Sequence, residues 1–130
     1  MPVVGKNVPH DSAVGHVTGE SVYVDDIALV HNELVVDFLW SPLAHARIRS
    51  LDVETARAIP GIVGLFTYRD LQHNLFGPVS RDEILLAEDE CLFRGQPIVV
   101  IAADHPRTIA EAKKAIKVDL VALEPILTIS

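Results

Sequence analysis

Hydrophobic and polar positions alternate along the segment that begins at Glu33. In "ELVVDFLW" the larger apolar residues recur at every second position, which is the spacing of a strand with one buried face. Ser41 and Pro42 then interrupt the pattern. We therefore expect a strand that buries one row of side chains, namely Leu34, Val36, Phe38 and Trp40.

A second pattern covers residues 94–118, "RGQPIVVIAADHPRTIAEAKKAIKV". The run "PIVVIAA" is apolar at successive positions, as in a central strand covered on both faces. Pro106 suits the first position of a helix, and an apolar stripe follows at helical spacing, made by Ile109, Ala112 and Ile116. The charged residues Glu111, Lys113, Lys114 and Lys117 would face water, the lysines near a helix C-terminus that favours cations. With the strand predicted in "KVDLVALEPI", a helix over 106–117 gives a βαβ-like piece of a mixed sheet.

Between these segments the sequence predicts shorter elements. Asp52 can cap a helix near 53–58 that Pro60 and Gly61 end, and "IVGLF" reads as a buried strand. Thr67 and Asp70 form a capping-box pattern at a short helix near 68–72. A long loop over 72–83 follows.

The first thirty residues lack sustained periodicity and mix Gly, Pro, His and Ser, with "VYVDDI" at most a short extended piece. We therefore expect one α+β domain over 1–130, with an irregular arm at 1–30 and the core at 31–130.

Composition narrows the class of protein further. Apolar residues make up 49% of the 130 residues and charged residues 22%, and the net charge is −7, so an ordered acidic domain is expected and nucleic acid is a poor partner. No apolar run approaches the length that spans a bilayer, and the N-terminus lacks the regions of a signal peptide. The single Cys91 excludes a disulfide within the chain and fits a reducing compartment. A cytoplasmic location is the expectation.

Candidate chemistry is sparse. A phosphate-binding loop places glycines after its strand, where "ADHPRT" has none, so Gly95, Gln96 and Pro97 read as a turn that starts the strand. Cys91 beside an apolar segment reads as a core residue. The serines lie outside a nucleophile elbow: Ser41, Ser50 and Ser80.

Six histidines raise a metal hypothesis, but none pairs at helical spacing: His10, His16, His31, His45, His73 and His105. The acidic groups lack the pattern of a calcium loop and read as solvated: Asp25 with Asp26, Asp82 with Glu83, and Glu88 with Asp89 and Glu90. We predict no catalytic, cofactor-binding or metal-binding residue in this chain.

Four segments together carry a resemblance that no single motif carries. In order they are "VTGESVYVDDI", "LWSPLAHARIRSLDVETARAIPGIVGLFTYRDL", "DEILLAEDE" and "CLFRGQPIVVIAADHPRTIAEAKKAIKVDLVALEPIL". From about Val17 to the end the chain resembles the α/β hammerhead domain of the molybdenum-binding large subunit of the xanthine dehydrogenase and aldehyde oxidase family. The arm and the ending "EPILTIS" favour the xanthine dehydrogenase branch, and hence purine catabolism.

The resemblance implies a scaffolding role. Members of this family are oxidoreductases that use molybdenum–pterin, 2Fe-2S clusters and FAD, and those cofactors are expected on other domains or subunits. Gln96 is not carried over as a pterin ligand, because the pterin-contacting glutamine of the family lies beyond this chain. This chain alone is expected to be inactive, to pack on the pterin-binding domains, and to be prone to form a homodimer through an uncovered interface. The alternative is a stand-alone small-ligand or protein-binding module, with a pocket around His45 and the loop 72–83.

Overall fold

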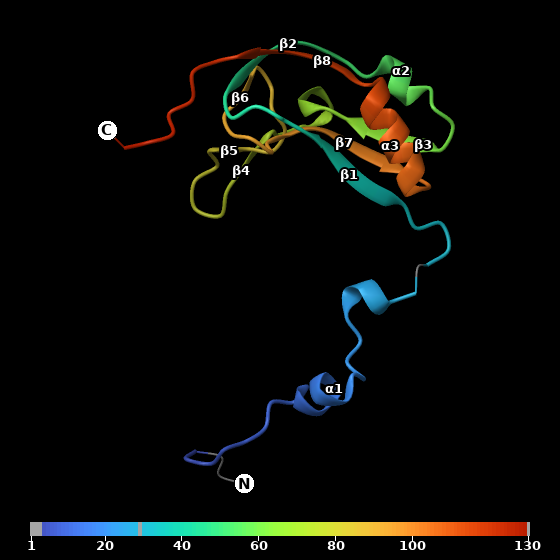
Figure 1. The fold of residues 1–130 in the computed structure, drawn as a ribbon, viewed down its shortest axis with the longest axis vertical. Coiled ribbons are helices and arrows are strands. Elements are labelled where there is room, and N and C mark those ends of the chain that lie inside the picture. Colours follow the sequence, from blue (N-terminus) through green and yellow to red (C-terminus); the bar gives the residue numbers. More distant parts are fainter. Residues whose placement is uncertain (1–3, 29, 130) are drawn as a thin grey trace. The chain divides into compact units, whose positions relative to one another are not determined.

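The computed structural model describes residues 4–28 and 30–129. The chain divides into two compact units, residues 1–31 and residues 32–130, which are described separately (Figure 1). Among the described residues no helix is both long and apolar enough to cross a membrane.

The first unit is more ordered than the sequence pattern predicted. It contains a helix, α1 (Ala13–Thr18), and a 3-10 turn, η1 (Val24–Asp26). The turn replaces the extended piece expected at "VYVDDI", because the Asp26 carboxylate accepts the N–H of Tyr23 and closes a capping box. No residue of α1 is buried.

The second unit is built from small antiparallel sheets. One sheet has the strand order β1-β7-β3, formed by Val35–Trp40, Pro97–Ala103 and Ile62–Phe66. The other has the order β6-β2-β8, formed by Glu90–Cys91, Ala46–Asp52 and Lys117–Ala122. A short hairpin pairs β4 (Leu75–Phe76) with β5 (Glu83–Ile84).

The helices of the second unit lie where the sequence predicted them. They are α2 (Glu54–Arg57), η2 (Tyr68–Asp70) and α3 (Pro106–Ala115). The Asp52 carboxylate accepts the N–H of Glu54, and the Thr67–Asp70 capping box is present. The helix α3 ends at Ala115, so Lys117 lies in β8 rather than in the helix.

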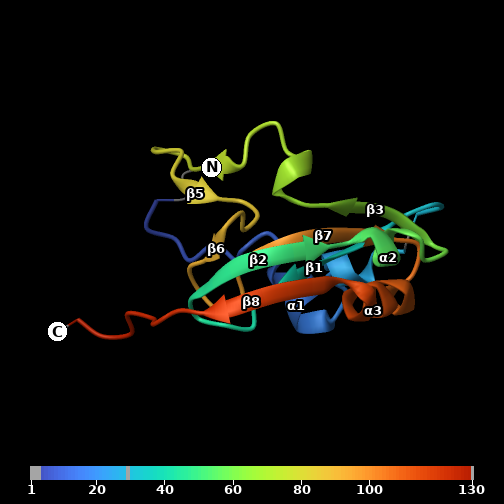
Figure 2. The ribbon, with the colours of Figure 1, turned by 90° about the horizontal axis from the view of Figure 1, so that it is seen from above.

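The core lies between α3 and one face of the β1-β7-β3 sheet, with the β2–β8 ribbon alongside (Figure 2). Ile109 and Ala112 of α3 pack with the fully buried residues of β7, namely Val99, Ile101 and Ala103. The α+β fold class is therefore confirmed. The strands before and after α3 belong to different sheets, so the helix is not the crossover of a βαβ unit. The reason is that β1 and β3 already occupy both edges of β7, and β8 pairs with β2 instead.

The predicted orientation of β1 was wrong. Val35 and Leu39 face the core, opposite the buried Ala103 and Val99 of β7, while the row that contains Val36, Phe38 and Trp40 faces outward. Alternation could not decide between the two faces because both carry apolar residues. The inward face also carries Asp37, whose carboxylate lies 2.6 Å from the ammonium of Lys113 on α3.

The segment 72–83 is also more regular than the loop that the sequence predicted, since it forms the β4–β5 hairpin. The Asn74 side chain fixes its base, donating to the carbonyl of Leu86 at 2.8 Å and accepting from the N–H of Leu86 at 2.9 Å.

Candidate functional site

The Gly95–Gln96 turn is built into the backbone of the core. Gly95 adopts φ +90°, and its N–H donates to the carbonyl of Ser41 at 2.8 Å. Gln96 is only 1% exposed, and its side-chain oxygen accepts the N–H of Leu92 at 2.6 Å. The amide is therefore committed to closing the loop before β7 rather than aimed at a ligand.

The thiol of Cys91 lies in the core, as predicted, and is fully buried. Burial raises the pKa of the thiol, and the hydroxyl of Ser41 opposes that rise only in part. Ser41 is itself buried and donates to the carbonyl of Leu43 at 2.9 Å. A buried, protonated thiol beside a hydroxyl already in use is a packing residue, not a nucleophile.

The histidines do not converge. In the first unit the rings of His10 and His16 lie 6.3 Å apart, and His16 Nδ1 lies 2.8 Å from the hydroxyl of Tyr23. His105 caps α3 by accepting the N–H of Arg107, whereas His31 and His73 are exposed. Across residues 4–28 and 30–129, no group of three or more His, Cys, Asp and Glu side chains could hold a metal ion.

The donor set also does not fit the cofactors that the resemblance implied. An iron–sulfur cluster takes about four thiolates, and this chain has one cysteine. In the described part of the chain every buried side-chain nitrogen and oxygen already has a hydrogen-bond partner. None of these buried atoms is therefore left unpaired for a pterin or a flavin.

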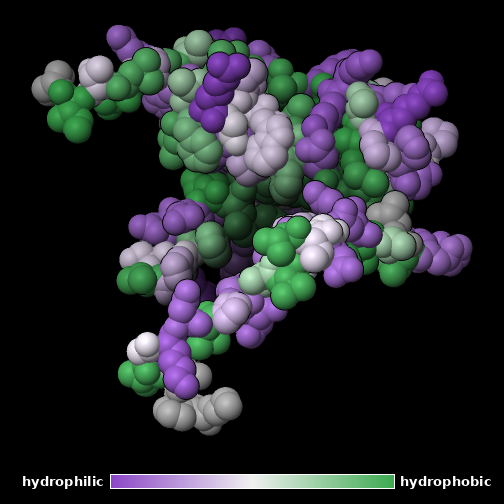
Figure 3. Space-filling view, turned by 60° about the horizontal axis from the view of Figure 1, so that its bottom comes forward, coloured by the Kyte–Doolittle hydropathy of each residue, from purple (hydrophilic) through white to green (hydrophobic). Residues whose placement is uncertain are grey.

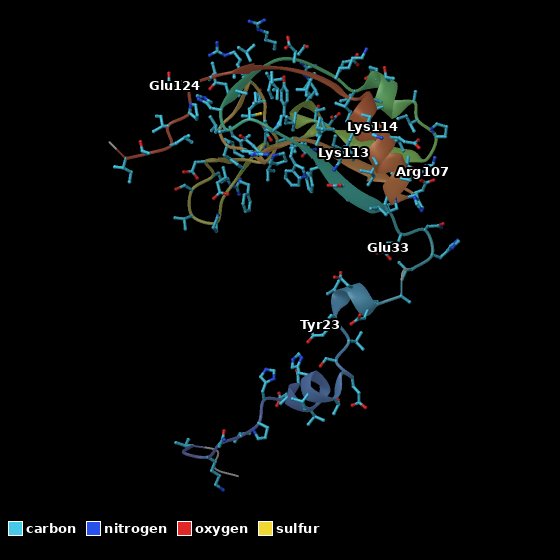
Figure 4. The ribbon with its side chains drawn as sticks, viewed as in Figure 1. Tyr23, Glu33, Arg107, Lys113, Lys114 and Glu124 are labelled. Carbon is cyan, nitrogen blue, oxygen red and sulfur yellow. The ribbon has the colours of Figure 1, made fainter. Side chains whose placement is uncertain are left out.

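His45 lies in a charged cluster directly before the start of β2. Its Nε2 is 3.6 Å from the carboxylate of Glu90, which also accepts a 2.9 Å hydrogen bond from Arg47. The Arg47 bond is the main reason that the pKa of Glu90 lies below its usual value. His45 Nδ1 lies 3.1 Å from the carbonyl of Glu124, and the His45 carbonyl accepts the N–H of Leu123, so the cluster holds the segment after β8. Glu124 is labelled on this segment in Figure 4.

A groove of about 450 Å³ contains His45 together with Phe93 and Leu127. None of its lining residues comes from the loop 72–83, so the structure does not combine His45 and that loop into one pocket.

A larger groove, of about 550 Å³, lies between β2, α2 and η2. Its charged lining mixes both signs: Arg49, Arg57, Arg69, Asp52, Glu54, Asp70, Glu88 and Asp89. Asp70 has a lowered pKa because it accepts hydrogen bonds from the backbone and side chain of Thr67, which is its capping role. The acidic pairs at Asp25 and at Asp82 are exposed.

Sequence reasoning missed the ion pair of Asp37 and Lys113, which joins β1 to α3. Lys113 is labelled on α3 in Figure 4. The hydrogen bond from Lys113 is the main reason that the pKa of Asp37 lies below its usual value, and the N–H of Phe38 donates to the same carboxylate. The signal available in the sequence was the single charge inside the apolar run "VVDFLW".

The feature that stands out is an apolar surface. We use the name outer sheet face for the side of the β1-β7-β3 sheet that α3 does not cover, formed by Val36, Phe38, Trp40, Phe66, Val100 and Ala102. Val36 and Phe38 lie opposite Ala102 and Val100 on β7, and Phe66 lies opposite Val100 from the other edge. Opposed residues of paired strands point to the same face, so these side chains form one continuous patch.

The outer sheet face is partly open to solvent, and Phe38, Val100 and Ala102 on it are half-buried. Val36 is 55% exposed, and Trp40 and Phe66 are each 45% exposed. The rings of Phe38 and Trp40 contact each other, with centroids 4.7 Å apart. Figure 3 shows hydrophobic residues at the surface of the molecule, interspersed with hydrophilic ones. Exposed apolar patches of this kind are typical of interaction sites.

Comparisons with known proteins identify the family of the chain. Residues 18–124 match the family described as "Aldehyde oxidase and xanthine dehydrogenase, a/b hammerhead domain". The chain is 36% identical to xanthine dehydrogenase of Calliphora vicina over 95% of its length and 9% of that protein. It is 39% identical to aldehyde oxidase 1 of Oryctolagus cuniculus, again over 95% of this chain and 9% of the relative.

Solved structures give the same result. The Cu,Mo-CO dehydrogenase structure matches with a TM-score of 0.78 and 30% identity over 92% of this chain and 15% of that one. Quinoline 2-oxidoreductase from Pseudomonas putida 86 matches with a TM-score of 0.77 and 28% identity over 95% of this chain and 17% of that one. The chain thus spans about a tenth of these curated relatives and about a sixth of these solved chains. Fold, strand order and sequence identity lead to one conclusion: the chain belongs to the aldehyde oxidase and xanthine dehydrogenase family and is its a/b hammerhead domain.

Proposed function

We propose that this chain is the N-terminal structural domain of the large subunit of a molybdenum-containing hydroxylase of the xanthine dehydrogenase type. In this role it supports the pterin-binding domains and the subunit contacts, and it has no catalytic site of its own. Molybdenum–pterin, 2Fe-2S clusters and FAD would be bound by other segments of the enzyme, which would act in purine catabolism in the cytoplasm. The buried, reduced thiol of Cys91 fits such a compartment.

The observation that carries the proposal is the outer sheet face in a chain that spans about a tenth of its relatives. A domain that worked alone would cover such a surface or keep it polar, because exposed aromatic residues favour self-association. Two titratable groups in the grooves are instead engaged in structure, Asp70 in a helix cap and Glu90 in an ion pair.

The experiment is to express the chain alone and together with the remainder of the same large subunit, and to measure mass and metal content after purification. We expect the chain alone to carry no stoichiometric molybdenum, iron, pterin or flavin, and to be recovered with them only in the complex. Stoichiometric binding of a small molecule by the chain alone would overturn the proposal. It would support the alternative of a stand-alone binding module, with the groove beside His45 as the first place to examine.

A further inference from the structure

We propose that the outer sheet face is the surface by which this chain docks on another domain of the same large subunit, with Phe38 and Trp40 at the centre of the contact. This inference rests on the proposed function and specifies it, because a scaffold domain could use any of several exposed surfaces. The hairpin residues Leu75 and Phe76 and the loop residue Phe93 are also exposed.

The chemistry of the outer sheet face is that of the centre of a permanent interface. Its two cross-strand rows are Val36–Ala102–Gly64 and Phe38–Val100–Phe66, and neither contains a charged residue. The centres of such interfaces are depleted in charge and enriched in aromatic side chains, each of which covers about 150–250 Å² when buried. By contrast, Phe93 lines the groove beside His45 together with the charged residues Arg94 and Glu124.

The face is also firm enough to act as a docking platform. The ring of Phe66 lies over Gly64, since a Cβ added at Gly64 would meet that ring at 2.6 Å. The rings of Phe38 and Trp40, from the same strand, contact each other at a tilt of 36°. A preformed aromatic surface on a sheet loses little side-chain freedom on binding, which favours affinity.

The edge of β1 is less suited to association than its face. β1 is an edge strand, and Asp37 in its middle holds a carboxylate that is paired with Lys113 and accepts the N–H of Phe38. A charge placed within an edge strand protects it from strand addition by another chain. Pairing of two copies edge to edge is therefore disfavoured, and so is close approach of two chains that each carry a net charge of −7.

The comparisons indicate which partner covers the outer sheet face. In the solved relatives the matching fold is about a sixth of a longer chain, so the greater part of each chain lies outside the matched segment. The remainder of the same subunit is thus the partner that is always present at one copy per domain, and it can offer an apolar surface without the cost of encounter between separate molecules.

Trp40 is the only tryptophan of this chain, which makes its fluorescence a direct reporter of the face. Under the proposed docking, the Trp40 emission moves to shorter wavelength when a tryptophan-free version of the remaining large subunit is added. Phe38→Ser and Val36→Ser, which keep Trp40, each weaken the complex at least tenfold. Phe93→Ser is the matched control, because Phe93 is 56% exposed on a different surface, and it leaves affinity unchanged. Far-ultraviolet circular dichroism of each variant establishes that the fold is retained.

The outcomes separate the inference from the proposed function. If the complex forms but Trp40 emission and the Phe38→Ser affinity do not change, the docking face is wrong while the scaffold role stands. If no complex forms at all, the proposed function itself fails. If a dimer that Phe38→Ser dissociates persists when the remaining large subunit is present, the face is covered by a second copy and the inference is overturned.

Discussion

Replacing Gln96 by Leu tests whether the turn before β7 is structural. The side chain is 1% exposed, and its oxygen accepts the N–H of Leu92 at 2.6 Å. Leu has a similar volume, so Gln96→Leu removes the acceptor without opening a large cavity. The backbone bonds of residue 96 to Phe93 and Ser41 can persist, since they do not involve the side chain.

The expected cost follows from the group that is left without a partner. A buried donor that loses its acceptor costs about 1–3 kcal/mol, so we expect the free energy of unfolding to fall by about 2 kcal/mol. For a domain of about 100 residues, 1 kcal/mol corresponds to about 4–8 °C in Tm, so Tm should fall by about 8–16 °C.

Urea denaturation followed by circular dichroism, with a thermal scan, measures both quantities. Gln72→Leu is the matched control, because Gln72 is exposed and the same replacement there should change the free energy of unfolding by less than about 0.5 kcal/mol. A Gln96→Leu variant as stable as the original chain would refute the structural assignment and reopen the turn as a binding loop.

Three further predictions concern an ion pair, a glycine and the thiol. Lys113 holds the pKa of Asp37 below its ordinary value. The contribution of this ion pair to the free energy of unfolding is therefore complete above the unfolded pKa of about 3.9, and it is lost as pH falls through the folded pKa. Lys113→Met should therefore lower the free energy of unfolding by about 0.3–1 kcal/mol at pH 7. In urea titrations the variant should also lose less stability than the original chain between about pH 5 and pH 2, and an unchanged pH profile would contradict the pairing. Gly61→Ala should lower the free energy of unfolding by about 2 kcal/mol in the same assay, because the φ of Gly61 is +92° and the new Cβ would lie 2.5 Å from the Asp104 carboxylate. A loss of less than about 0.5 kcal/mol would contradict this expectation and show that the turn relaxes. Cys91 should react with a thiol reagent far more slowly in the folded chain than in urea, because burial raises the pKa of its thiol, and equal rates would refute its core position.

Elements that depend on local chemistry were predictable from the sequence. The capping box of Thr67 and Asp70 and the start of α3 at Pro106 rest on residues within one turn of each other, and both are present. The turn at Gln96 was also predicted, although the bond of its side chain to Leu92 was not. Such features need no knowledge of which strands pair.

Features that depend on long-range pairing were not predictable in the same way. The placement of β8 beside β2 follows from β1 and β3 occupying both edges of β7, and no pattern within "KVDLVALEPI" contains that information. The hairpin over 72–83 depends on two-residue strands and the Asn74 side chain, a signal too short for periodicity to register. The pair of Asp37 and Lys113 joins positions 76 residues apart.

The orientation of β1 shows why a domain of a larger enzyme misleads this kind of reasoning. Alternation finds the more apolar row of a strand, and that row was expected to face the domain's own core. In β1 the row with Phe38 and Trp40 faces outward, because the inward row holds Asp37 for Lys113 and packs smaller residues against α3. The strand is thus apolar on two sides because it serves two interfaces, one within the domain and one proposed toward its neighbour.

Under this proposal, Phe38→Ser should change the free energy of unfolding of the isolated chain by less than about 1 kcal/mol while weakening assembly. Leu39→Ala should instead lower the free energy of unfolding of the isolated chain by about 2–4 kcal/mol. Measuring both variants by urea denaturation distinguishes a core face from a docking face, and a larger loss for Phe38→Ser would return that row to the core.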